Sequence, residues 1–163
     1  MRGTLLKLAG SAAIAGGALR IANAFTTGML DEHTLQLLYF ATDFFFVLGL
    51  IGIYAPRSEA LGALGLIGFV VSILGFLIIR SATLMVFGMG GYMFGATVAL
   101  LGVAMLSIAM LLKKNGSRWP PIIWLLALAL GIASTFGLSI AALAAGIAFG
   151  AGFVAAGFEL IAA

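Results

Sequence analysis

The side chains best suited to chemistry in this chain lie in two short polar stripes within apolar sequence. Their members are Arg20, Asn23 and Thr27 in the first stripe, and Gln36, Tyr39 and Asp43 in the second. Each stripe follows the spacing i, i+3, i+7, which places its side chains on one face of an α-helix. The charged turn 31–33 separates the stripes, so two antiparallel helices would bring Arg20 and Asp43 to about the same depth. The other members would then pair in order, Asn23 with Tyr39 and Thr27 with Gln36.

The expected pair of Arg20 and Asp43 has two interpretations. A charged side chain near the centre of a transmembrane helix costs about 2.5–3.5 kcal/mol on insertion scales, and an opposite charge beside it removes much of that cost. The pair would therefore serve either as a structural clamp between two helices or as a proton, ion or small-solute site. Because the arginine charge favours an ionised carboxylate, Asp43 is poorly suited to carry a proton at rest, and this favours the clamp.

The composition places these stripes in a lipid bilayer. Of the 163 residues, 64% are hydrophobic and only 8% are charged, and the mean hydropathy is +1.28. A soluble domain carries about a quarter charged residues. Three runs without a charge, 60–79, 81–112 and 119–158, are each long enough for at least one spanning helix of about 20 residues. We therefore expect an all-α integral membrane protein.

The expected protein is a single bundle of about six transmembrane helices. The expected spans are 4–29, 34–54, 60–79, 91–112, 121–133 and 139–161. The fifth span is the shortest, so five spans are the alternative. Residues 81–90 form either an interfacial or re-entrant segment, or the upper part of one long helix with a hinge at Gly88, Gly90 and Gly91.

The basic residues predict the orientation. In this layout Arg80 lies on one side of the membrane, and the other side carries Arg2, Lys7, Arg57, Lys113, Lys114 and Arg118. Because cytoplasmic loops are enriched in Lys and Arg, we expect both termini in the cytoplasm and a multi-pass protein of a plasma (inner) membrane. The N-terminal stretch up to Ala22-Asn23-Ala24 also resembles a cleavable signal peptide. Cleavage would leave Asp43 without its matched arginine, so a retained span is favoured.

Paired glycines predict where helices approach closely. Gly91 and Gly95 are spaced four apart, as are Gly146 and Gly150, and such small-residue faces let membrane helices pack against a neighbour. The sequence leaves open whether that neighbour belongs to the same chain, a second copy or another membrane protein.

Several classes of site are not expected. The chain has no cysteine, and His33 is its only histidine, so we expect neither a metal site nor a bound cofactor. The basic residues sit at helix ends without a clustered basic face, which argues against nucleic-acid binding. Serine, histidine and aspartate show no catalytic arrangement. Glu159, near the C-terminus, is expected at the membrane interface, or paired with Lys7 or Lys113.

These observations favour a non-enzymatic structural or accessory membrane subunit, packed through its small-residue helix faces. The alternative is a small transporter or channel that uses Arg20 and Asp43. A membrane enzyme acting on lipid is a third class, but the loops offer few catalytic groups. A water-filled cavity that reaches Asp43 would favour transport, whereas a dry polar contact would favour the accessory subunit.

Overall fold

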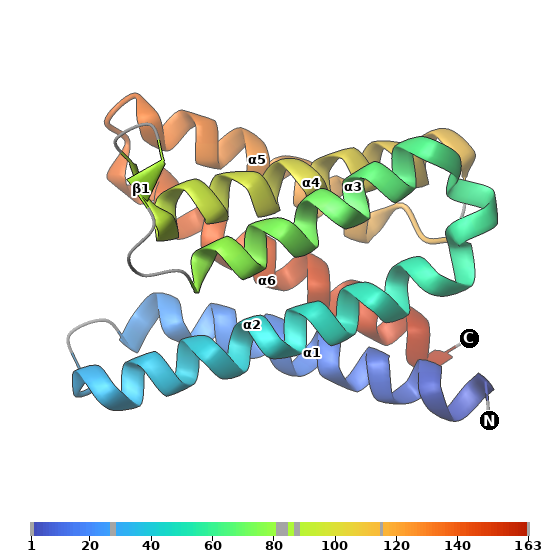
Figure 1. Cartoon of the computed structure of the whole chain (residues 1–163), viewed down its shortest axis with the longest axis horizontal. Helices are drawn as coiled ribbons and strands as arrows, with labels where there is room; N and C mark the ends of the chain where they lie inside the picture. The colour runs from blue at the N-terminus through green and yellow to red at the C-terminus, as the bar shows by residue number, and fades with distance from the viewer. Residues whose placement is uncertain (1, 27–28, 81–84, 87–88, 115, 163) are drawn as a thin grey trace.

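The computed structural model describes all residues except 1, 27–28, 81–84, 87–88, 115 and 163, and it is a bundle of α-helices (Figure 1). The helices are α1 (Arg2–Thr26), α2 (Glu32–Tyr54), α3 (Ser58–Ile79), α4 (Gly91–Lys113), α5 (Trp119–Thr135) and α6 (Ser139–Ala162). A short 3-10 helix, Ala55–Arg57, joins α2 to α3. The expected all-α class is confirmed.

Four stretches of the described chain are long and apolar enough to cross a membrane. They are Gly3–Thr26, Glu32–Ile79, Gly91–Lys113 and Ile140–Ala162. The second covers 48 residues because α2 and α3 follow one another almost without interruption. The apolar helix at Trp119–Ser134 is shorter. Multiple helices of this kind indicate association with a membrane.

Residues 85–86 and 89–90, which precede α4, are not part of a long kinked helix. Its described residues form a two-stranded antiparallel ladder of β1 (Met85–Val86) and β2 (Met89–Gly90), in which Met85 pairs with Gly90. Helix α4 begins directly afterwards, with extended backbone at its N-cap residue Gly90. The ladder pairs backbone groups that a broken helix would leave open. Gly88, the third expected hinge glycine, lies outside the described residues.

The tightest helix contacts pass through glycine. Helix α1 packs on α6, and α3 packs on α4. A Cβ atom added to Gly150 would lie 2.6 Å from the carbonyl oxygen of Gly17, and one added to Gly95 would lie 2.5 Å from the amide nitrogen of Ile79. Gly91 is also buried, at the start of α4. The faces of Gly95 and Gly150 are thus occupied by helices of the same chain.

An aromatic cluster fills the middle of the bundle. Phe46 from α2 has its ring centre 4.3 Å from that of Phe153 in α6, and 5.6 Å from that of Phe76 in α3. Trp124 from α5 is fully buried beside Phe153, and its indole Nε1 donates a hydrogen bond of 3.3 Å to the carbonyl oxygen of Phe149. Rings from α2, α3, α5 and α6 therefore pack against one another between the two ends of the bundle.

Candidate functional site

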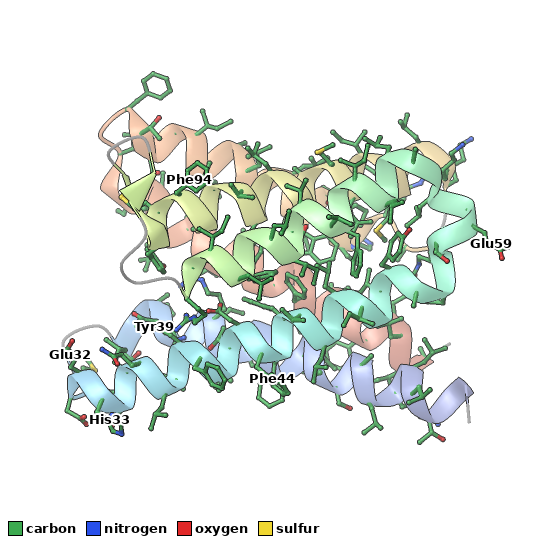
Figure 2. All side chains as sticks on the ribbon, in the orientation of Figure 1. Glu32, His33, Tyr39, Phe44, Glu59 and Phe94 are labelled. Carbon is green, nitrogen blue, oxygen red and sulfur yellow. The ribbon has the colours of Figure 1, made fainter. Side chains whose placement is uncertain are left out.

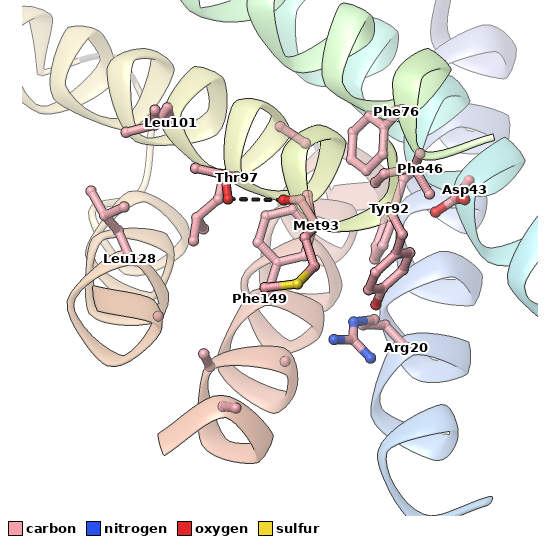
Figure 3. A pocket seen from close by; sticks show the side chains of 18 of the residues that line it. Arg20, Asp43, Phe46, Phe76, Tyr92, Met93, Thr97, Leu101, Leu128 and Phe149 are labelled. Atoms are coloured by element: carbon pink, nitrogen blue, oxygen red, sulfur yellow. Dashed lines mark hydrogen bonds between the residues drawn. The ribbon is translucent and has the colours of Figure 1, made fainter. Parts of the chain in front are cut away.

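A pocket of about 450 Å³ lies on one side of this aromatic cluster. Helices α1 to α6 all contribute to its wall, through residues near the ends of α1, α3 and α5 and near the starts of α2, α4 and α6. Figure 3 shows the aromatic rings of Phe46, Phe76 and Phe149 on the pocket wall together with the charged side chains of Arg20 and Asp43. The pocket therefore combines an apolar interior with a small number of charges.

Asp43 forms its ion pair with Arg80 rather than with Arg20. The expected partner was therefore wrong. Arg80 is the C-cap residue of α3, and its long side chain reaches the carboxylate on the neighbouring helix α2. The pair is partly open, with 16% of the Asp43 side chain and 34% of the Arg80 side chain exposed. The sequence marked Arg80 as the end of an apolar run, but it did not indicate which way the side chain turns.

Arg20 lines the same pocket, and among the described residues it has no ion-pair or hydrogen-bond partner. Its guanidinium lies against Gly146 of α6, where an added Cβ atom would fall 2.6 Å from Nη2 and 3.0 Å from Cζ. In Figure 3 the Arg20 side chain extends from α1 into the pocket, and Tyr92 of α4 points toward it. Gly146, expected as a helix-packing residue, thus provides room for the arginine.

Asn23 does not pair with Tyr39 as expected. Asn23 Nδ2 donates a hydrogen bond of 3.1 Å to Thr42 Oγ1, and both side chains are buried. Tyr39 lines the pocket without being the hydrogen-bond partner expected for Asn23. Gln36 is exposed and bonds to Glu32 within its own helix. Thr27 lies outside the described residues. A neutral hydrogen bond, Asn23–Thr42, therefore connects α1 and α2 beside the pocket.

A second charged cluster, which we call the Glu159 latch, lies at the opposite end of the bundle. Glu159 Oε1 accepts hydrogen bonds from Arg57 Nη2 at 2.7 Å and from the backbone nitrogen of Ser117 at 3.0 Å. Arg57 Nη1 also donates to the carbonyl oxygen of Ile53, at 2.9 Å. The latch thus ties the turn between α2 and α3, the loop between α4 and α5, and the end of α6. The expected lysine partners of Glu159 were wrong.

The loop before α2 carries a simple helix cap. Asp31 is the N-cap residue, and its Oδ1 accepts a hydrogen bond of 3.0 Å from the backbone nitrogen of Thr34. Hydrogen bonding by Thr34, first through its side chain and then through its backbone N–H, lowers the pKa of Asp31 below its ordinary value of 3.8, because it favours the ionised carboxylate. Glu32 and His33 follow at the same end of α2 (Figure 2). Their position fits a helix start in water rather than a binding site.

No protein-family model, no curated protein and no solved structure matches this chain. The chemistry of the pocket is set by two arginines, Arg20 and Arg80, against one aspartate, Asp43. The ion pair of Asp43 and Arg80 uses one charge of each sign. The arrangement therefore leaves one positive charge, on Arg20, facing a mainly apolar pocket.

Proposed function

We propose that this chain is a multi-pass protein of the plasma (inner) membrane, with six transmembrane helices and both termini in the cytoplasm. The two termini and the turn between α2 and α3 lie at one end of the bundle (Figure 1). Arg57 lies there, in contact with the end of α6. Lys113 and Arg118 flank the loop that contacts the same glutamate. An excess of lysine and arginine is typical of the cytoplasmic side.

Within this topology we propose that the chain is a small transporter. The observation that carries the proposal is the pocket that reaches both Arg20 and Asp43. A volume of about 450 Å³ is in the range of small-molecule sites, which are concave, mostly apolar and carry few polar groups. Charged residues at membrane depth commonly mark substrate or ion pathways. A purely structural clamp would be closely packed around its charges.

The opposite side of the aromatic cluster supports transport by alternating access. Below Phe46 and Phe153 the bundle is filled by buried side chains such as Leu50, Ile53 and Leu160. The Glu159 latch joins three chain segments at the cytoplasmic end. In this conformation the pocket lies on the outer side of the barrier, and passage to the cytoplasm requires the latch and the aromatic cluster to separate.

Cysteine accessibility tests this proposal, because the chain has no cysteine of its own. Thr97→Cys places a thiol in the pocket, and Ser107→Cys places one on the same helix at a fully buried position. Both native hydroxyls donate to the carbonyl oxygen four residues earlier, so the two variants are closely matched. Each is treated with a membrane-impermeant thiol reagent in right-side-out and in inverted vesicles.

A transporter should expose Thr97→Cys to the reagent from both sides over time, while Ser107→Cys stays unmodified. Modification of Thr97→Cys from the outer side alone would overturn transport. If Thr97→Cys is modified from neither side, the pocket is dry, and a structural or accessory subunit becomes the better-supported function. Lys114→Cys, in the exposed loop after α4, tests the orientation, because it should react only in inverted vesicles.

A further inference from the structure

If the proposed function holds, the positive charge of Arg20 indicates which class of solute the pocket binds. Among the described residues Arg20 forms no ion pair of its own; the charge of Asp43 acts on it from a greater distance, but that carboxylate is already paired with Arg80. A guanidinium stays protonated under all ordinary conditions. Placing an unpaired positive charge at membrane depth is unfavourable, so an anion that enters the pocket gains from its contact with Arg20.

The pocket also limits how much negative charge it accepts. Among the described residues that line it, the charged ones are Arg20, Arg80 and Asp43, and they sum to a single positive charge. The Asp43 carboxylate lies on the same wall and repels a second negative charge. The complementary ligand therefore carries one negative charge rather than two.

The rest of the pocket is complementary to an apolar group. Phe46, Phe76 and Phe149 form its aromatic wall, with ring centres of Phe46 and Phe149 5.4 Å apart. Met93 and Leu101 of α4 add aliphatic surface (Figure 3). Contact with such side chains stabilises a ligand because it removes apolar surface from water.

We propose that the pocket binds a monocarboxylate with an apolar body. Its carboxylate lies at the Arg20 guanidinium, whose planar fork of N–H donors matches two carboxylate oxygens. Its apolar body points toward Phe46, Phe76 and Phe149. Gly146 supports this geometry by leaving space for the guanidinium on the face of α6.

Isothermal titration of the full chain in detergent tests the proposal with 3-phenylpropionate as the probe. The neutral amide 3-phenylpropanamide has the same body without the charge. We expect the acid to bind at least about 10-fold more tightly than the amide, because a hydrogen bond to a charged group contributes roughly 1.5–3 kcal/mol. Arg20→Gln should weaken the acid by about 10- to 100-fold. Arg118→Gln removes an equal charge outside the pocket and should leave its affinity unchanged.

Equal affinity for acid and amide, or unchanged binding by a folded Arg20→Gln variant, would overturn the proposal. If Arg20→Gln does not fold, Gly146→Ala provides the second test, since its new methyl group displaces only the end of the Arg20 side chain. This variant should lower the affinity for the acid and leave the affinity for the amide unchanged. Equal losses for both ligands would contradict a carboxylate at Arg20.

A lipid headgroup is the other source of an anionic group at Arg20, and nanodiscs distinguish it. We expect the melting temperature to be the same in phosphatidylcholine and in phosphatidylglycerol nanodiscs. Stabilisation by phosphatidylglycerol that is lost in Arg20→Gln, without binding of 3-phenylpropionate, would assign the site to lipid and overturn the proposal. The cysteine measurements report transport separately. If Thr97→Cys is modified from both sides but 3-phenylpropionate does not bind, only the ligand class is refuted. If 3-phenylpropionate binds but Thr97→Cys is modified from one side alone, only transport is refuted.

Discussion

The two ends of the bundle use the same kinds of side chain with opposite results. At the cytoplasmic end, as we propose it, the Glu159 latch holds one carboxylate between an arginine and a backbone N–H, and its two side chains are only 11% and 21% exposed. At the other end, Asp43 and Arg80 form a more exposed pair beside an unmatched Arg20. In the function that we propose, the matched charges hold one end of the bundle closed, and the surplus positive charge beside the open pocket binds an anion.

The largest effect should come from breaking the closed end. Glu159→Gln leaves the largely buried Arg57 without its carboxylate, and removing one partner of a buried pair costs about 3–5 kcal/mol. We expect the free energy of unfolding in detergent to fall by about 3 kcal/mol. The same change should speed the reaction of Thr97→Cys in inverted vesicles, because the latch no longer holds the cytoplasmic end.

Glu59→Gln is the matched control for the latch. Glu59 is exposed at the start of α3, near the same end of the bundle (Figure 2). Its replacement should change neither stability nor the rate of thiol modification. A Glu159→Gln variant that behaves like this control would show that the latch does not hold the end closed.

Two glycines on α6 separate packing from binding. Gly150→Ala sets a methyl group against the backbone of Gly17, and such overpacking costs about 1–3 kcal/mol. Gly146→Ala meets only the flexible end of Arg20, so its free energy of unfolding should change by less than about 0.5 kcal/mol. The affinity for 3-phenylpropionate should fall in Gly146→Ala. Equal destabilisation of the two variants, measured by denaturant unfolding, would contradict this division.

The open end should respond to charge in both directions. Asp43→Asn raises the net charge of the pocket and should strengthen binding of 3-phenylpropionate several-fold. Arg80→Gln frees Asp43 to compete for Arg20, and should weaken the same ligand by a similar factor. Titration of both variants checks the sign of each change. Shifts in the same direction would mean that the variants act through folding rather than through pocket charge.

The smallest effect concerns the helix cap at Asp31. Its pKa is lowered in the folded chain by the bond from Thr34. The cap therefore stabilises the fold above the ordinary pKa of aspartate, and this contribution is lost as the pH falls through the lowered pKa. Asp31→Ala should reduce the melting temperature slightly at neutral pH. The difference from the unmodified chain should vanish in acid, and a difference that persists there would rule out this ionisation as its cause.

Helical spacing predicted the part of the pocket wall that α1 and α2 supply. Arg20, Asn23, Tyr39 and Asp43 do line one pocket, because residues on one face of a helix share a neighbour. Spacing does not give the rotation of one helix against another, so it could not distinguish Thr42 from Tyr39 as the partner of Asn23. Spacing along two helices also does not predict where a third helix packs. For this reason Arg80, at the end of α3, was missed as the partner of Asp43.

Long-range pairs were the least predictable part of the fold. Arg57 and Glu159 are 102 residues apart in sequence, and several basic residues were equally plausible partners for the glutamate. Glycine spacing predicted that a helix face makes a close contact, but it did not predict which group the glycine contacts. Gly146 and Gly150 belong to one four-residue pattern, yet one faces an arginine side chain and the other faces the backbone of α1.

The glycine contacts between helices also govern how this protein can diverge over generations. Along α1 and α6, Gly10 faces Gly157 and Gly17 faces Gly150, at positions two helical turns apart. A larger residue at any of them collides with backbone, whereas exposed apolar positions such as Phe44 (Figure 2) accept many side chains. Accepted substitutions should therefore accumulate on the outer surface. Distant descendants of this chain would keep the glycine spacing long after their overall identity had faded.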